Sequence, residues 1–469
     1  MPSPSLAIPP YAGVCTAEET RRRGFSVAEA ARRLHRLVFV QRRLALIAAA
    51  QLNCTPEWEV KPALALHAWL DTEHADQLRL RVLELRENES RIAAPADPGL
   101  AAFMDEVLFA SGAAELLCAV YEVVRPAMLQ AIEDYLREAN PLADQPTCRI
   151  LKIIRMEETE TLAWGRAAAQ ALHNSAAASP THAYGARLRA YLAAAGGIDG
   201  THPRPSPDSL PPPRAAHPFI PSLTPRRDAR FHGLYDTSIP ADTVYNDESR
   251  GIDERNLALL FKRVREMDVP EVIAGIISET PNRTGEYYRD MFRQMWDESR
   301  HALLGQAALE ARGVDWTSLP INVTFSYKMA KFLQAPERHV LLYAIEQSLM
   351  SARTGKPYEY NIATQSGDAL STTFHDFDWA DEVLHAAIGR RHLRSSAGAN
   401  SGLPLQDQTE ILRQAEHLVD RIAHRLQDGD MPQDAPPPDW WERFAEKTLG
   451  HPVEKVKSAH LSDWRPVSS

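Results

Sequence analysis

Two short Glu-x-x-His pairs in the second half of the chain have the residue types and the spacing of metal ligands. The pairs are Glu298 with His301 and Glu382 with His385. Residues i and i+3 of a helix project from the same face, so each pair can bind one metal ion together. Carboxylates are hard oxygen donors that can bridge two ions, and a neutral imidazole suits iron and, less selectively, manganese or zinc. The two pairs therefore indicate a site for two metal ions.

A two-metal site between four helices also needs one carboxylate from each of the other two helices. Glu346 fits the third helix, because it lies on an otherwise apolar stretch 36 residues before Glu382. Glu271 is the candidate on the first helix, where it continues an apolar stripe and would be costly to bury without a metal or partner. The segment Asp268-Val-Pro-Glu271 is equally typical of a helix start, in which Glu271 closes a capping box. The alternatives for the first-helix ligand are Glu279 and Glu266.

The order Glu, Glu-x-x-His, Glu, Glu-x-x-His resembles the ferritin-like superfamily of non-haem dimetal (di-iron) carboxylate proteins. Its members include ribonucleotide reductase small subunits, multicomponent monooxygenase hydroxylases, arylamine N-oxygenases, rubrerythrins and ferritins. The resemblance covers residues 251–395 strongly and 26–173 weakly. It implies two iron ions, with manganese or a mixed manganese–iron pair as alternatives. The ligands that it implies are Glu271, Glu298, His301, Glu346, Glu382 and His385.

His375 is an additional ligand candidate, since it lies seven residues before Glu382 and approaches the same helix face. Extra histidine ligands occur in the arylamine N-oxygenase branch of the superfamily. A polar histidine near a helix end is the more ordinary interpretation. Catalytic residues beyond the metal ligands are not identified by the sequence.

Apolar residues at three- and four-residue spacing dominate the chain, which predicts an all-α fold. We expect two tandem ferritin-like four-helix bundles joined by a proline-rich linker. The expected parts are a degenerate N-terminal bundle (20–174), the linker (175–250), a dimetal bundle (251–395), and a C-terminal helix and tail (396–469). The expected bundle helices run at about 26–53, 58–88, 99–138 and 144–173, and again near 251–279, 284–312, 335–353 and 374–395.

The two halves match at a nearly constant offset of 224–227 residues, which indicates an internal duplication. The N-terminal copy keeps Asp71, His74, Glu122 and Glu158, but it has Thr161 where His385 stands and no acid where Glu271 stands. We expect a structural pseudo-site without metal. Its remaining polar groups would pair with arginines of the first helix, such as Arg42 and Arg43.

Composition excludes several classes of protein. The net charge of -10 and the pI near 6.0 argue against a nucleic-acid partner. No stretch reaches the roughly 18 apolar residues that span a membrane. The four cysteines show no C-x-x-C spacing, and no secretory signal is recognised, so we expect a reduced, cytoplasmic location.

These patterns predict an O2-dependent non-haem dimetal oxidoreductase that acts on a small organic molecule. The chain contains neither G-x-G-x-x-G nor a Walker A sequence, so electrons would come from a separate reductase or from the substrate. The alternatives are a metal-binding or ferroxidase-type protein and a non-catalytic ferritin-like scaffold. A monomer and a homodimer are both compatible with the sequence.

Overall fold

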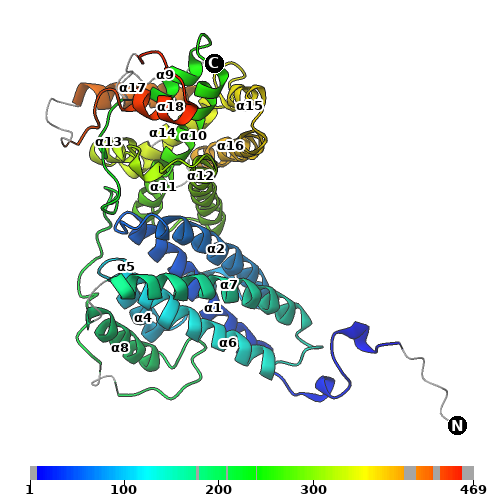
Figure 1. The fold of residues 1–469 in the computed structure, drawn as a ribbon. Helices are drawn as coiled ribbons and strands as arrows, with labels where there is room; N and C mark the ends of the chain where they lie inside the picture. The colour runs from blue at the N-terminus through cyan, green and yellow to red at the C-terminus, as the bar shows by residue number, and fades with distance from the viewer. Residues whose placement is uncertain are drawn as a thin grey trace. The chain divides into compact units, whose positions relative to one another are not determined.

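The computed structural model describes residues 8–175, 179–206, 210–238, 240–395, 408–425, 432 and 434–456. Within these residues the chain is helical and contains no β-strand, which confirms the all-α prediction (Figure 1). The chain divides into two compact units. Unit 1 comprises Met1–Ile47 and Leu70–Ile220, and unit 2 comprises Ala48–Trp69 and Pro221–Ser469.

Helices account for most of both units. The helices that begin before residue 200 are α1 (Val27–Leu52), α2 (Val60–Glu84), α3 (Glu89–Ala93), α4 (Pro98–Leu108), α5 (Ala113–Leu117), the π-helical η3 (Cys118–Val124), α6 (Arg125–Glu138), α7 (Gln145–Ser175) and α8 (Ser179–Ala194). The later helices are α9 (Pro240–Asn246), α10 (Ile252–Arg265), α11 (Asp268–Glu279), α12 (Gly285–Ala311), α13 (Thr324–Phe332), α14 (Ala335–Ser348), α15 (Lys356–Gln365), α16 (Ala369–Ser395), α17 (Gln408–Arg425) and α18 (Trp440–Leu449).

The compact units do not follow the expected domain bounds. Residues 175–220 of the expected linker belong to unit 1 and residues 221–250 to unit 2, and each part contains a helix. Residues 48–69, which we expected in the first bundle, belong to unit 2. The tandem bundles and the linker between them stay a prediction.

The long helices of unit 2 form a closed circuit of contacts. Helices α10 and α11 pack on α12, α12 packs on α16, α16 on α14, and α14 on α11. Helix α10 approaches α12 closely at Gly305, where an added Cβ would lie 2.3 Å from the backbone nitrogen of Val264. Gly305 is four residues after His301 on α12, so this close approach brings the end of α10 beside the part of α12 that carries Glu298 and His301.

The predicted helix 251–279 is in fact two helices, α10 and α11. Pro270 has no backbone N–H, so it cannot donate to the carbonyl of Glu266 and the helical ladder stops there. A helix does start at Asp268, as the helix-start interpretation has it, but Met267 and not Asp268 occupies the N-cap position. The Asp268 carboxylate instead accepts from the backbone nitrogens of Phe325 (2.9 Å) and Ser326 (3.2 Å) at the start of α13.

Aromatic side chains from distant segments fill the core of unit 2. Trp58, Phe231 and Trp316 pack together with ring centroids 4.9–5.6 Å apart. The C-terminal helix α18 packs on the same core, because the Trp440 ring lies 5.0 Å from that of Phe261 on α10. Helix α18 therefore contributes to the core of unit 2.

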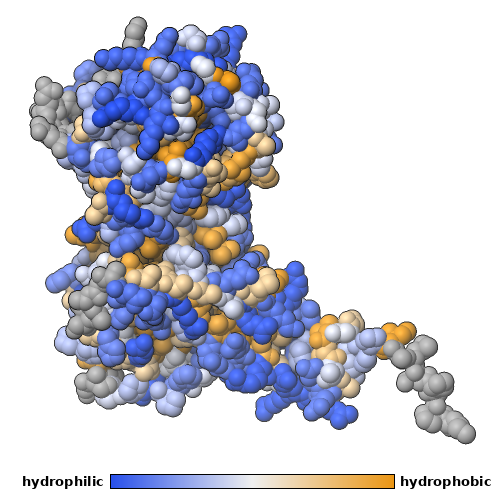
Figure 2. Space-filling view, viewed as in Figure 1, coloured by the Kyte–Doolittle hydropathy of each residue, from blue (hydrophilic) through white to orange (hydrophobic). Residues whose placement is uncertain are grey.

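Hydrophilic residues dominate the face of the molecule seen in Figure 2. Among the described residues, no helix is both long enough and apolar enough to cross a membrane.

We predict that Gly305→Ala destabilises unit 2 by about 1–3 kcal/mol, because the new methyl group would force α10 away from α12. Denaturant unfolding measures this loss. Ala307→Ser, an exposed change on the same helix, is the control and should cost less than about 0.7 kcal/mol. Equal stability of the two variants would contradict the close approach at Gly305.

Candidate metal centre

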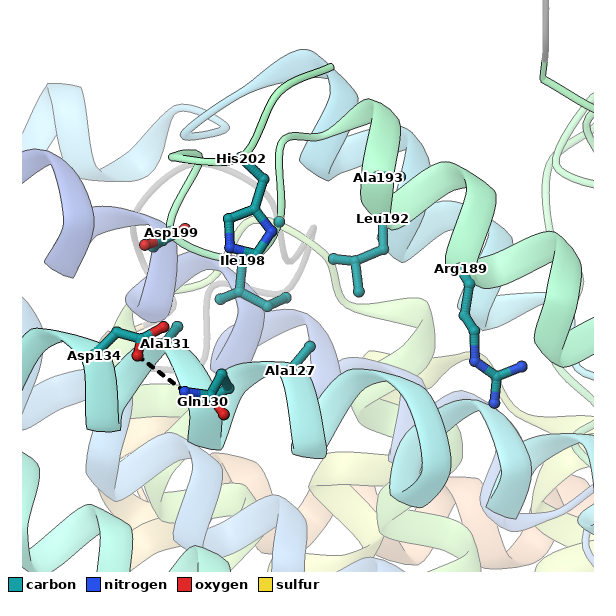
Figure 3. A pocket seen from close by; sticks show the side chains of 11 residues that line it. Ala127, Gln130, Ala131, Asp134, Arg189, Leu192, Ala193, Ile198, Asp199 and His202 are labelled. Atoms are coloured by element: carbon teal, nitrogen blue, oxygen red, sulfur yellow. Dashed lines mark hydrogen bonds between the residues drawn. The ribbon is translucent and has the colours of Figure 1, made fainter. Parts of the chain in front are cut away.

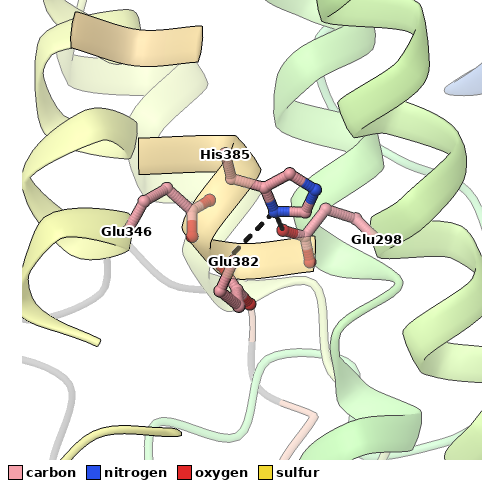
Figure 4. Close-up of side chains that lie close together, drawn as sticks. All are labelled: Glu298, Glu346, Glu382 and His385. Atoms are coloured by element: carbon pink, nitrogen blue, oxygen red, sulfur yellow. Dashed lines mark hydrogen bonds and ion pairs between the residues drawn. The ribbon is translucent and has the colours of Figure 1, made fainter. Parts of the chain in front are cut away.

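Four of the predicted ligands meet in the interior of unit 2. Glu298, Glu346, Glu382 and His385 each offer one ligand atom, and these atoms lie within 4.8 Å of one another (Figure 4). They come from three helices, α12, α14 and α16, and each is at most 2% exposed. The Nδ1 atom of His385 lies 3.0 Å from Glu298 and 3.3 Å from Glu382, so the imidazole and two carboxylates face one point.

His301 lies in a second, overlapping arrangement. It forms one group with Glu266 and Glu298 and another with Asp378 and Glu382, under the same 4.8 Å criterion. Its Nδ1 atom lies 3.2 Å from Asp378 and 3.5 Å from Glu298. Glu298 and Glu382 are shared with the first group, which is the arrangement that bridging carboxylates require. The carboxylate–histidine cluster is defined here as Glu266, Glu298, His301, Glu346, Asp378, Glu382 and His385.

An aspartate stands behind each of the two histidines. His301 Nε2 lies 3.2 Å from Asp381, and His385 Nε2 lies 3.4 Å from Asp297. Each aspartate directly precedes the glutamate of one pair and reaches the histidine of the other helix. A proton on Nε2 donated to a carboxylate leaves Nδ1 with a free lone pair directed into the cluster.

Two arginines fix these aspartates. Arg300 Nη2 lies 2.8 Å from Asp297 and 2.6 Å from Asp381, and Arg293 Nε lies 2.7 Å from Asp297. Burial opposes ionisation of Asp297, but hydrogen bonds from His385 and Arg293 lower its pKa to about 2. The charged aspartate therefore holds its imidazole in one orientation over the usual pH range.

The interior of the cluster is strongly negative. Burial, together with the neighbouring carboxylates of Glu382 and Glu298, raises the pKa of Glu346 well above its usual range. Burial disfavours a charged imidazole, yet Asp378, Asp381 and Glu298 together raise the pKa of His301 to about 10. A field that favours a proton this strongly also favours a metal cation.

Two buried polar atoms in the cluster make no hydrogen bond of acceptable geometry, namely Oε2 of Glu266 and Nδ1 of His301, although Nδ1 lies 3.2 Å from Asp378. They lie 3.8 Å apart. Buried polar atoms are rarely left unsatisfied unless a water or an ion pairs with them. The donor set of carboxylate oxygens and imidazole nitrogens fits iron, manganese or zinc.

The structure does not place Glu271 in this cluster. Its carboxylate is fully buried and binds the ammonium of Lys61 (2.6 Å) and the guanidinium of Arg227 (2.9 Å to Nη2). The expectation of a continuous helix caused this error, because the break at Glu266 turns the following residues onto another face. Glu266, one of the two alternatives, occupies the position beside His301 instead.

The other two candidates also lie apart from the cluster. Glu279 pairs with Arg338 and is only partly buried. His375 is buried, and its Nδ1 lies 2.8 Å from the Ser371 carbonyl, which accepts from the ring. Burial lowers the pKa of His375 to about 4, and the nearby Arg263 adds to this effect. Among the described residues, His375 belongs to none of the groups that could hold a metal ion.

Unit 1 contains a related group in which an arginine takes the central place. Asp71, His74 and Glu158 lie close together, and Arg125 lies 2.8 Å from Asp71 and 2.9 Å from Glu158. The expected partners were wrong: Arg43 pairs with Asp105, and Arg42 donates to the Ile92 carbonyl. Glu122, which we expected at this site, is exposed. The π-helix directly before Arg125 was not anticipated either.

A cavity of about 210 Å³ also occurs in unit 1, between α6, the end of α8 and residues 197–202 (Figure 3). Its polar side chains are largely engaged with each other or with near neighbours. Gln130 donates to Asp134, and Asp199 accepts from Thr201. The cavity shows no convergent set of groups comparable with the carboxylate–histidine cluster.

Comparisons with protein-family models, with curated proteins and with solved structures find no match to this chain. The functional interpretation therefore depends on the geometry of unit 2.

The Glu271 ion pairs generate a prediction about stability. Glu271→Gln would leave two buried cations without a counter-charge and should cost about 3–5 kcal/mol in denaturant unfolding. Glu59→Gln is the control, because Glu59 and Arg230 form an exposed pair that contributes about 0–1 kcal/mol. The metal content of the folded Glu271→Gln protein should equal that of the wild type. If the variant loses a bound ion while its stability is unchanged, Glu271 is a metal ligand after all.

Proposed function

We propose that unit 2 binds two metal ions at the carboxylate–histidine cluster and that the protein is an O2-dependent oxidoreductase for a small organic molecule. The observation that carries the proposal is the pair of histidines whose Nδ1 atoms face shared carboxylates while their Nε2 atoms face aspartates. It supports membership of the ferritin-like dimetal class.

The residues divide into two sets around the shared Glu298 and Glu382. Glu346 and His385 would complete the position on one side, and the remaining three residues would complete the other: Glu266, His301 and Asp378. Two redox-active ions, iron above all, would supply the electrons that reduce dioxygen.

The chain itself would provide orientation and protection from water. Asp297 and Asp381 hold both imidazoles with Nδ1 directed inward, and such outer partners raise the basicity of a ligating histidine. Burial of the carboxylates keeps bulk water away from the reacting centre. The absence of a nucleotide-binding motif favours a separate reductase, or a substrate that supplies its own electrons.

Reconstitution with ferrous iron under anaerobic conditions tests the proposal. We expect two ions per chain by elemental analysis, followed by O2 consumption when air and a chemical reductant are added. His385→Ala should lose at least one ion and the O2 consumption, because it removes a nitrogen donor that the neighbouring carboxylates cannot replace.

His74→Ala is the matched control in unit 1, where Arg125 already neutralises the acids, and it should retain two ions. No bound iron would refute the metal centre. Two ions without O2 consumption would favour the metal-binding alternative, and four ions would show that unit 1 also binds metal.

A further inference from the structure

Lys356 places a positive charge inside the carboxylate–histidine cluster. The residue begins α15, and its side chain is completely buried. Its Nζ atom lies 2.8 Å and 2.9 Å from the two oxygens of Asp378 and 2.8 Å from Glu382. The ammonium group therefore binds oxygens that the proposed function assigns to metal.

The positive charge is not distributed evenly over the two metal positions. Lys356 also lies 3.7 Å from Glu266, and Arg263 contacts both Glu266 (2.8 Å) and Asp378. Glu266 and Asp378 both belong to the His301 side of the cluster, whereas Glu382 is shared by the two sides. Within the described chain, no lysine or arginine forms an ion pair with Glu298 or Glu346.

An ammonium group and a metal ion compete for the same oxygen lone pairs. Lysine offers one positive charge and three donors on a flexible four-carbon stem, so its head can leave by rotation of the side chain. Arg263 is more firmly held, because it also binds Glu359 (3.0 Å). Lys356 is thus the cation that can be displaced.

We propose that Lys356 is an internal cation that occupies the His301 side of the cluster and must turn away before a second metal ion binds there. The inference rests on the proposed metal centre. The first ion binds on the side of Glu346 and His385, where, among the described residues, the one ammonium contact is that of Lys356 to Glu382. The second ion binds more weakly, because it has to displace Lys356. Loading of the centre is therefore stepwise.

Titration with manganese(II) under anaerobic conditions tests this order of binding. Equilibrium dialysis with elemental analysis gives the two affinities, and electron paramagnetic resonance separates isolated from coupled ions. In the wild type, the first equivalent should give the spectrum of an isolated ion, and the second should bind at least about tenfold more weakly. A coupled spectrum from the first equivalent onward would overturn the proposal without any variant.

Lys356→Met keeps the length of the side chain and removes its charge, so the weaker step should tighten at least about tenfold. Lys356→Gln serves the same purpose should the methionine variant fold poorly. Lys262→Met is the matched control, because Lys262 contacts Glu359 but none of the cluster residues, and both affinities should stay within about threefold of wild type.

The outcomes separate this inference from the proposed function. Two ions in the wild type, with a second step that is unchanged or weaker in Lys356→Met, would overturn the role of Lys356 and leave the metal centre intact. If the second ion binds equally more tightly to Lys262→Met, the effect is a general one of charge, and direct competition by Lys356 is overturned. No bound manganese in any of these proteins would overturn both proposals.

Discussion

The confinement of many carboxylates in one water-poor interior is the constraint on which unit 2 depends. Six of them are at most 2% exposed: Asp297, Glu298, Glu346, Glu359, Asp378 and Glu382. Buried like charges repel strongly, so the fold can exist only where cations accompany them. Arg263 and Lys356 supply part of this compensation from α10 and α15. The aspartates behind the histidines extend the same network to Arg293 and Arg300.

Local geometry explains which parts of this arrangement were predictable from the sequence. The i, i+3 spacing holds within any helix, so Glu298 with His301 and Glu382 with His385 could be read directly. Glu346 was recognisable as an acid on an apolar stretch. The repeated Asp-Glu-x-x-His pattern could also have revealed Asp297 and Asp381, and Asp378 lies one helical turn before Glu382. Their role as metal ligands or ligand partners stays a prediction.

The missed features depend on tertiary structure or on a single helix break. The choice between Glu266 and Glu271 turned on Pro270, whose missing N–H ends α10. Lys356 stands at a helix start that follows a tight loop, and nothing in its neighbours indicates that its ammonium reaches α16. Arg125 escaped notice because the expected partners were on another helix. In each case the spacing of residues within one helix carries no information about the element that packs against it.

Arg125 gives unit 1 a counter-ion that is covalently part of the chain. A guanidinium of this kind stays charged at any physiological pH and cannot be removed by a chelator. A metal ion that neutralises acids acts differently, because its stabilising effect grows with its free concentration. If unit 2 binds metal, the buried acids of the two units are neutralised by different cations: an arginine of the chain in unit 1 and a metal ion from solution in unit 2. The stability of unit 1 would then be set by the chain alone, whereas that of unit 2 would depend on the concentration of free metal ion around the protein.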